Sequence, residues 1–206
     1  RYELERVGRT DLTYFVYPNG GPEGIKPLER QISNRPEIIF LASYFEKWHG
    51  LDLLLDSVAR SSQDFVLHIV GEVSSSDQYR AMGDPRVIIH GPLLPDQVRR
   101  VAKSCWLGIT SLALPRKGMH QACALKVREY LSMGLPAYGS YEEVLPPNFP
   151  YYVQGPASID GALQVAWSFR LVSAREIASA SQPFISKTRL LSELYSYIVA
   201  TVGSRD

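Results

Sequence analysis

The feature that most constrains the fold is an alternation of short, continuously apolar segments with stretches of helical periodicity. Continuously apolar runs of strand length are typical of strands that are buried on both faces of a sheet. Their alternation with helices predicts an α/β fold, a doubly wound parallel sheet of about six strands with helices on both faces. The predicted strands are 37–42, 65–70, 87–90, 106–110, 135–139 and 151–153.

The helical stretches are expected over 48–60, over 95–103, and from a start between 121 and 125 to Met133. Gly134, directly after the last of these, is a typical helix stop. Beyond residue 155 the pattern is helical only, with helices expected over 158–171, 174–180 and 186–202. A strand is also predicted over 14–21, where it ends in a Pro-Asn-Gly-Gly turn. We therefore expect one domain over 1–206, with 1–30 as a linker segment and 156–206 as a helical C-terminal part.

Composition and cysteine usage exclude several classes of protein. A chain of 206 residues with 45% hydrophobic residues can bury a core without disulfides. Its net charge of +1 gives no electrostatic basis for a nucleic-acid partner. Cys105 and Cys123 have apolar neighbours and no metal-binding spacing, which predicts reduced, buried thiols in a cytoplasmic protein. No apolar run approaches the ~20 residues of a membrane span.

Several familiar catalytic motifs are missing from the sequence. It has no Walker P-loop, no Gly-x-Gly-x-x-Gly after the first strand and no Gly-x-Ser-x-Gly elbow. These absences argue against a nucleotidase, a dinucleotide enzyme and a serine hydrolase. The Asp-x-Asp pair that clamps a metal ion is also absent, and we expect no metal site.

Parallel sheets bind ligands at the carboxyl ends of their strands, so the loops 43–50 and 111–125 are the candidate site. The helix after the second loop presents free N–H groups and a positive dipole end to a phosphate. Helical spacing directs Arg128 and Glu129 away from its apolar stripe and places Lys126 on the flank. Lys126 is a candidate phosphate cation, and Glu129 is a candidate acceptor for sugar hydroxyls. The alternative is an ordinary solvated, charged helix face.

The first loop ends in Trp48-His49-Gly50, an unusual composition for a simple connector. His49 could donate a hydrogen bond near the helix start, and Gly50 leaves room for a ligand. The alternative is that His49 caps or packs locally. His68 and His90 fall in strands and are expected to be structural, while His120 is a secondary ligand candidate.

Taken in order, the motifs resemble the C-terminal, donor-binding domain of family-4-type retaining glycosyltransferases of polysaccharide biosynthesis. Such enzymes have the GT-B fold of two Rossmann-like domains, so this chain would form one half of that fold. The resemblance covers most of the chain, from residue 17 to about residue 153. It rests on Pro18–Gly20, His49-Gly50-Leu51-Asp52-Leu53-Leu54, Ile69-Val70-Gly71, His90-Gly91 and Glu129-Tyr130-Leu131-Ser132-Met133-Gly134-Leu135-Pro136.

The resemblance implies a nucleotide-diphospho-sugar donor, UDP- or GDP-linked, and no further cofactor. It makes Glu129 the ribose ligand and places the phosphates against the backbone of Ala124 and Leu125. The chain departs from the family pattern at three positions. The first Glu of the family motif is Gln121 here, the usual Arg aligns near Ser43, and the usual Lys aligns with His49. Neutralisation of the phosphates is therefore expected from Lys126, Lys117, Arg116 or Lys47.

The family's acceptor domain has no counterpart in this sequence, which begins at Arg1 in a polar segment. We therefore expect a fragment that lacks an N-terminal acceptor domain and is inactive alone, with the catalytic residues unassigned. The acceptor would be a glycan or a lipid-linked glycan, in the cytoplasm, with peripheral association at the inner face of the membrane as an option for the full-length protein. The alternatives are a nucleotide-sugar epimerase of the same fold and a degenerate, non-catalytic sugar-nucleotide-binding module.

Overall fold

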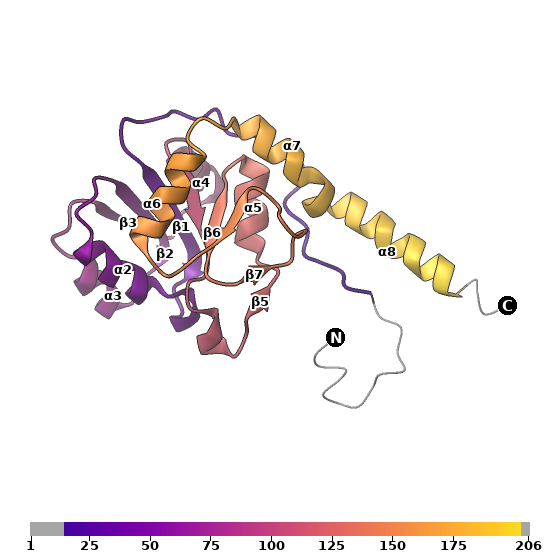
Figure 1. Ribbon diagram of the computed structural model, residues 1–206, viewed down its shortest axis with the longest axis horizontal. Helices are drawn as coiled ribbons and strands as arrows, with labels where there is room; N and C mark the ends of the chain where they lie inside the picture. The colour runs from indigo at the N-terminus through magenta and orange to yellow at the C-terminus, as the bar shows by residue number, and fades with distance from the viewer. Residues whose placement is uncertain (1–14, 203–206) are drawn as a thin grey trace.

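The computed structural model describes residues 15–202, and a six-stranded parallel sheet forms its centre (Figure 1). The strand order is β3-β2-β1-β4-β6-β8, so successive strands are added first to one side of β1 and then to the other. The topological switch point consequently lies between β1 and β4. The strands are β1 (Glu37–Tyr44), β2 (Val66–Glu72), β3 (Val87–Gly91), β4 (Leu107–Ile109), β6 (Ala137–Gly139) and β8 (Tyr152–Gln154).

Helices cover both faces of the sheet, as the apolar strands predict. On one face α2 (Leu51–Arg60), α3 (Ser75–Ala81) and α6 (Ile159–Ser168) pack over residues such as Ile38 and Phe40. On the other face α4 (Pro95–Ala102), α5 (Leu125–Met133) and α7 (Ala174–Ile185) pack over Ile39 and Leu41. The alternation of β1 side chains between the two cores follows from the period of two in a strand. The predicted Rossmann-like, doubly wound architecture is confirmed.

Short elements extend the loops at the carboxyl ends of the strands. They are the 3₁₀ turns η1 (Lys47–His49) and η2 (Leu114–Lys117) and the two-residue strands β5 (Gln121–Ala122) and β7 (Glu142–Glu143), which pair in parallel. The carbonyl oxygens of Trp48 and His49 accept hydrogen bonds from the backbone N–H groups of Ala113 and Leu112. The two loops predicted to form the site are thereby joined.

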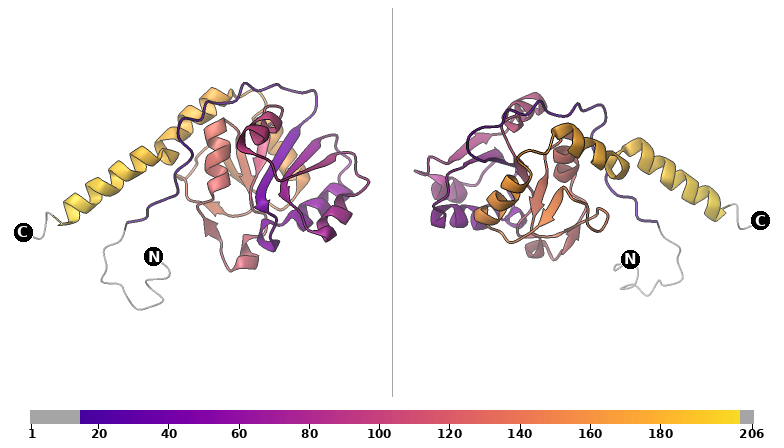
Figure 2. Two further views of the ribbon diagram at one scale, coloured as in Figure 1. Left: turned by 180° about the vertical axis from the view of Figure 1, so that it is seen from behind. Right: turned by 45° about the horizontal axis from the view of Figure 1, so that its top comes forward.

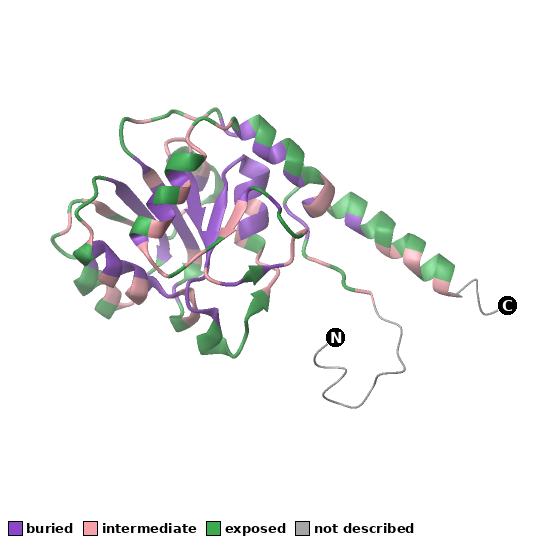
Figure 3. Cartoon of the chain, in the orientation of Figure 1, coloured by how far each residue is buried: buried purple, intermediate pink, exposed green. Residues whose placement is uncertain are grey.

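The last helix, α8 (Lys187–Val202), continues from α7 and extends away from the sheet (Figures 1 and 2). Most of its surface is exposed, in contrast to the sheet (Figure 3). The ring of Tyr197 packs on that of Phe15 with centroids 4.9 Å apart, so the first described residue contacts this helix. Within the described residues, the helices lack the combination of length and apolar character that crossing a bilayer requires.

Two expectations about the elements need correction, and one helix was not expected. The described residues of the predicted strand 14–21 form no strand, and Tyr14 lies outside the described range. Asn19 donates two hydrogen bonds to Cys123 instead of pairing with a strand. Its backbone N–H donates to the Cys123 sulfur at 3.0 Å, and its side-chain Nδ2 donates to the Cys123 carbonyl at 2.7 Å. Helix α3 was not predicted, and α7 runs to Ile185 rather than ending near residue 180.

Candidate functional site

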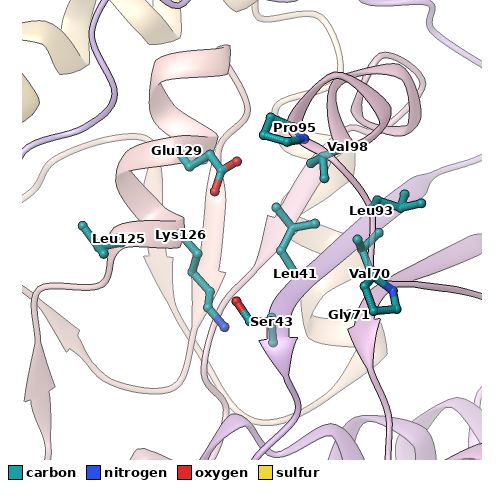
Figure 4. Close-up of a pocket in the computed structure, with 12 residues that line it drawn as sticks. Leu41, Ser43, Val70, Gly71, Leu93, Pro95, Val98, Leu125, Lys126 and Glu129 are labelled. Atoms are coloured by element: carbon teal, nitrogen blue, oxygen red, sulfur yellow. The ribbon is translucent and has the colours of Figure 1, made fainter.

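A cleft of about 450 Å³ opens at the carboxyl ends of β1 and β2, between α4 and the first turn of α5 (Figure 4). This is the edge at which doubly wound sheets bind their ligands, next to the switch point. The charged and hydroxyl side chains in its lining are Ser43, Lys126 and Glu129. The rest of the wall is mainly apolar, with Leu41, Val70, Leu93, Val98 and Leu125. An apolar cleft with a few convergent polar groups is the usual form of a small-molecule site.

Tyr130 holds β1 and β4 apart where the cleft begins. Its hydroxyl accepts the N–H of Leu41 at 2.9 Å and donates to the carbonyl of Ile109 at 3.0 Å. The direct pairing of the two strands ends at Phe40 and Ile109, and the buried phenol satisfies the backbone groups beyond that point. The sequence alone assigned no role to this hydroxyl.

Gly71 is the last residue but one of β2 and lines the cleft, at the point where β1 and β2 come very close. Its φ is +129°, a conformation that side-chain-bearing residues rarely adopt, and a Cβ there would overlap the carbonyl oxygen of Ala42. The close approach of the two strands therefore explains why glycine occupies the last position of Ile69-Val70-Gly71.

Lys126 extends from the first turn of α5 toward Ser43 (Figure 4). Its Nζ atom is shielded from solvent and has no hydrogen-bond partner, and it lies 5.4 Å from the centre of the Phe40 ring. Burial lowers the pKa of Lys126 to about 7, although the Glu129 carboxylate favours the charged form. An ammonium group without a partner in such a place is a cation suited to an anionic ligand.

Glu129 lies one turn further along α5, and its side chain extends toward α4 (Figure 4). Burial raises the pKa of Glu129, and the positive charge of Lys126 works against this rise. A carboxylate at the cleft wall can accept hydrogen bonds from vicinal hydroxyl groups. The interpretation of Glu129 as part of an ordinary solvated helix face does not fit this position, since the side chain is only partly exposed and lines a cleft.

Arg128 does not share the direction of Glu129, contrary to the prediction. It is fully buried, and its Nη1 donates to Glu143 Oε1 at 2.5 Å. Its Nη2 donates to the carbonyl of Val144 at 2.5 Å, and its Nε donates to the carbonyl of Asn19 at 3.2 Å. Helix α5 is thus anchored to the segment of the Pro-Asn-Gly motif, which gives Asn19 a structural role beside the site.

His49 lies in the turn η1 and is not among the residues that line the cleft, although it is close enough to Lys126 and Lys117 for their charges to act on it. Burial lowers the pKa of His49 to about 4, and the charges of Lys126 and Lys117 add to this effect. Its Nδ1 accepts the backbone N–H of Glu46 at 2.9 Å, so the neutral ring carries its proton on Nε2. His49 therefore caps the turn locally, as the alternative interpretation expected, and its Nε2–H remains as a donor.

Gly50 follows His49 with a left-handed backbone, φ +73°. A Cβ there would press on Leu112 and Ala113 at 3.0–3.1 Å, so this side of the glycine is filled by protein. Close packing of the two loops is the structural role of Gly50.

The other predicted cations lie outside the cleft lining. Arg116 forms a two-point ion pair with Asp52 at 2.7 and 2.9 Å, and it also donates to the carbonyl of Lys47. Lys117 lies 4.6 Å from the centre of the Trp48 ring. Lys47 itself is exposed and borders a neighbouring polar hollow together with Arg116. The structure thus brings Ser43, Leu125, Lys126 and Glu129 together but leaves these three cations apart from them.

Gln121 and Ala124 also point elsewhere. Gln121 is exposed on β5, and its Nε2 donates to Glu142 Oε1 at 2.8 Å. Ala124 is the N-cap of α5, within the range expected for the helix start. Its N–H donates to Glu143 Oε2 at 3.3 Å. The donor-binding roles assigned to all these residues stay predictions.

The histidines and cysteines away from the cleft have local partners. His68 contacts His90 through Nδ1 at 2.9 Å and Glu37 through Nε2 at 3.0 Å, which agrees with the structural role expected of both rings. His120 is exposed in the loop before β5. Both cysteines are free, with Cys105 buried and Cys123 partly buried.

Comparison with known families agrees with this architecture. A family model described as "Glycosyl transferases group 1" matches residues 35–141, which is more than half of the chain. The chain belongs to this glycosyltransferase family. No sequence match to a curated protein was found.

Solved structures of glycosyltransferases share the fold. The lipopolysaccharide outer core galactosyltransferase WaaB matches with a TM-score of 0.65 and 18% identity, over 88% of this chain and 54% of WaaB. Sucrose-phosphate synthase from Thermosynechococcus elongatus matches with a TM-score of 0.67 and 15% identity, over 97% and 56% of the two chains. HepE from Anabaena, in complex with UDP-glucose, matches with a TM-score of 0.57 and 15% identity, over 79% and 49%.

The chain therefore spans about half the length of these structures. Its fold is that of one half of a GT-B glycosyltransferase, which confirms the predicted resemblance and fold class.

Proposed function

We propose that this chain binds a nucleotide-diphospho-sugar, UDP- or GDP-linked, in the cleft at the ends of β1 and β2. In this proposal it is the donor-binding half of a retaining glycosyltransferase that needs no metal ion or further cofactor. The observation that carries the proposal is the free Lys126 ammonium, which faces the same cleft as the N-terminus of α5 and the Glu129 carboxylate. Together they match the phosphates and the ribose of a sugar nucleotide.

The chemistry assigned to this half is stabilisation of the departing diphosphate. Fixed N–H donors at the start of α5, the Lys126 cation and the Nε2–H of His49 would meet negative charge as it develops, without reorganisation of solvent. In this proposal these groups neutralise the charge of the diphosphate, and a metal ion is not needed for that purpose. The UDP-glucose complex of HepE supports a nucleotide sugar as the ligand class, because HepE shares the fold.

The whole enzyme would transfer its sugar to a glycan or lipid-linked acceptor, held by a second domain across the cleft. We place this reaction in polysaccharide or glycan biosynthesis in the cytoplasm, with peripheral contact to the inner face of the membrane. A non-catalytic sugar-nucleotide-binding module is the second candidate. It is favoured by Gln121, which stands where the family has a carboxylate and is bonded to Glu142 outside the cleft.

The first test is titration calorimetry of the chain with UDP-glucose, GDP-mannose, UDP, GDP and ADP. We expect saturable binding either of UDP-glucose and UDP or of GDP-mannose and GDP. Glu129→Ala should weaken this binding by about 1–3 kcal/mol, because hydroxyl groups of the ligand would lose their acceptor at a partly buried site.

Glu193→Ala is the matched control. It removes a carboxylate whose partner, Arg189, lies on the same exposed helix, so binding should be unchanged. Lack of saturable binding for every nucleotide would contradict the proposal. Equal affinities of Glu129→Ala and the unaltered chain for the nucleotide would show that Glu129 does not contact the ligand.

A further inference from the structure

The Lys126 ammonium is the least compensated charge in the cleft. Its Nζ atom is shielded from water and has no hydrogen-bond partner, although an ammonium group carries three donors. The face of the Phe40 ring at 5.4 Å offers only a weak attraction. A buried charge in such surroundings is costly unless a counter-charge arrives.

The groups that surround Lys126 provide no such counter-charge in contact. On α5, Glu129 is the carboxylate of the cleft lining, and its side chain extends toward α4 rather than toward Lys126 Nζ (Figure 4). From η1 comes His49, which carries no charge at neutral pH. Among the described residues, β1 contributes Ser43 and apolar side chains to this lining, β2 contributes Val70 and Gly71, and α4 with its preceding loop contributes only apolar side chains.

We propose that donor binding is coupled to the uptake of one proton by Lys126, so that the diphosphate binds the ammonium form that the cleft alone disfavours. This inference rests on the proposed function of the cleft. The proton comes from the solvent and ends on Nζ, and the diphosphate supplies the missing negative charge. A sugar nucleotide is esterified at both ends of its diphosphate, so it has no phosphate group that titrates near neutral pH and cannot itself account for the proton.

The direction of the pH dependence follows from linkage. Burial holds the pKa of Lys126 at about 7 in the free protein, and two nearby negative charges raise it in the complex. Between the two pKa values, affinity for the donor falls by about tenfold for each unit of rising pH. At pH 8 the free amine is mostly neutral, and binding should take up about 0.9 proton per donor. His49, with a pKa of about 4, does not titrate in this range.

The experiment is titration calorimetry with UDP-glucose and GDP-mannose at pH 8, in buffers that differ in ionisation enthalpy. The dependence of the observed enthalpy on the buffer gives the number of protons taken up. Lys126→Arg is the matched variant, because a guanidinium stays protonated at this pH. It should bind without proton uptake and with an affinity independent of pH from 7 to 9. Glu129→Gln should bind more weakly and still take up the proton.

The outcomes separate this inference from the function it rests on. Saturable binding by the unaltered chain with no proton uptake overturns the inference and leaves donor binding intact. Continued proton uptake by Lys126→Arg assigns the proton to another group and also overturns it. Failure of both nucleotide sugars to bind at pH 6, 7 and 8 contradicts the proposed function itself, and the inference with it.

Discussion

The buried pair of Arg128 and Glu143 fixes the start of α5, the helix that carries Lys126 and Glu129 of the cleft lining. Glu143 accepts hydrogen bonds from Arg128, from the hydroxyl of Tyr141 at 2.9 Å and from the N–H of Ala124 at 3.3 Å. The pair thus joins the start of α5 to β7 and, through Arg128, to Asn19. A buried ion pair with this many satisfied bonds stabilises one arrangement of its elements, and loss of one partner leaves the other charge unpaired.

We expect Arg128→Met to lower the free energy of unfolding by about 3–5 kcal/mol at pH 7.5, as measured by urea denaturation. Burial raises the pKa of Glu143, so the unpaired carboxyl of the variant can take up a proton. The loss should therefore shrink as the pH falls toward 5 and grow as it rises. Arg189→Met is the control, because its pair with Glu193 is exposed and should contribute less than about 1 kcal/mol. Similar losses for the two variants would contradict the role given to Arg128.

Helical periodicity could locate Lys126 and Glu129 but not the side of the helix on which Arg128 would lie. Helical spacing fixes the direction of the Cα–Cβ bond, but the long side chain of an arginine can still bend back toward a buried partner. The partner that decides its direction, Glu143, lies 15 residues further along the chain in a two-residue strand. A pattern read over a window of helix length contains no signal for such a partner.

At the scale of elements, most of the central sheet and its helices were predictable, because the strands are continuously apolar runs and the helices carry an apolar stripe of helical period. Helix α3 was not, because Ser75–Ala81 has no apolar stripe. It depends instead on Ser74, whose hydroxyl caps Asp77 N–H at 3.2 Å, and on the ion pair of Arg80 with Asp56. The predicted strand 14–21 failed for the opposite reason. Its composition favours a strand, but the bonds of Asn19 go to α5 and its preceding loop.

The approach of β1 and β2 at Gly71 gives the prediction at this scale. In Gly71→Ala, the new Cβ meets the carbonyl of Ala42 and the backbone must leave its φ of +129°. We expect a loss of stability of at least about 1–3 kcal/mol, as for strain at a special backbone conformation, and a large loss of donor affinity because the part of the cleft wall formed by Gly71 moves. Urea denaturation and calorimetry measure the two effects.

Gly83→Ala is the control for this substitution. Gly83 also has a positive φ, +85°, but a Cβ there meets no atom within 4 Å. Its variant should show backbone strain without a steric overlap, and donor affinity should be unaffected because Gly83 does not line the cleft. If Gly71→Ala bound the donor as tightly as Gly83→Ala does, the cleft would not depend on the close approach at β2.

At the scale of the whole molecule, the cleft draws its walls from both sides of the switch point. Leu41 and Val70 come from β1 and β2, whereas Lys126 and Glu129 come from α5, the α-helix between β4 and β6 in the chain. A ligand that contacts both groups is bound only when the two sides of the sheet are assembled, and the unfolded chain offers no equivalent site. Donor binding should therefore stabilise the entire fold rather than one loop.

A nucleotide sugar at 100 times its Kd should raise the free energy of unfolding by about 2.7 kcal/mol. For a chain of this size that corresponds to a rise in Tm of roughly 5–10 °C. Differential scanning calorimetry with the better of UDP-glucose and GDP-mannose measures it, with the matching nucleoside as the control that lacks phosphates. Glu129→Ala at the same donor concentration should show a smaller rise, because its Kd is higher. An equal rise in Tm with the nucleoside at the same concentration would mean that the phosphates of the donor make no contact at α5. An unchanged Tm at a concentration that saturates binding would place the ligand on a surface that the unfolded chain retains.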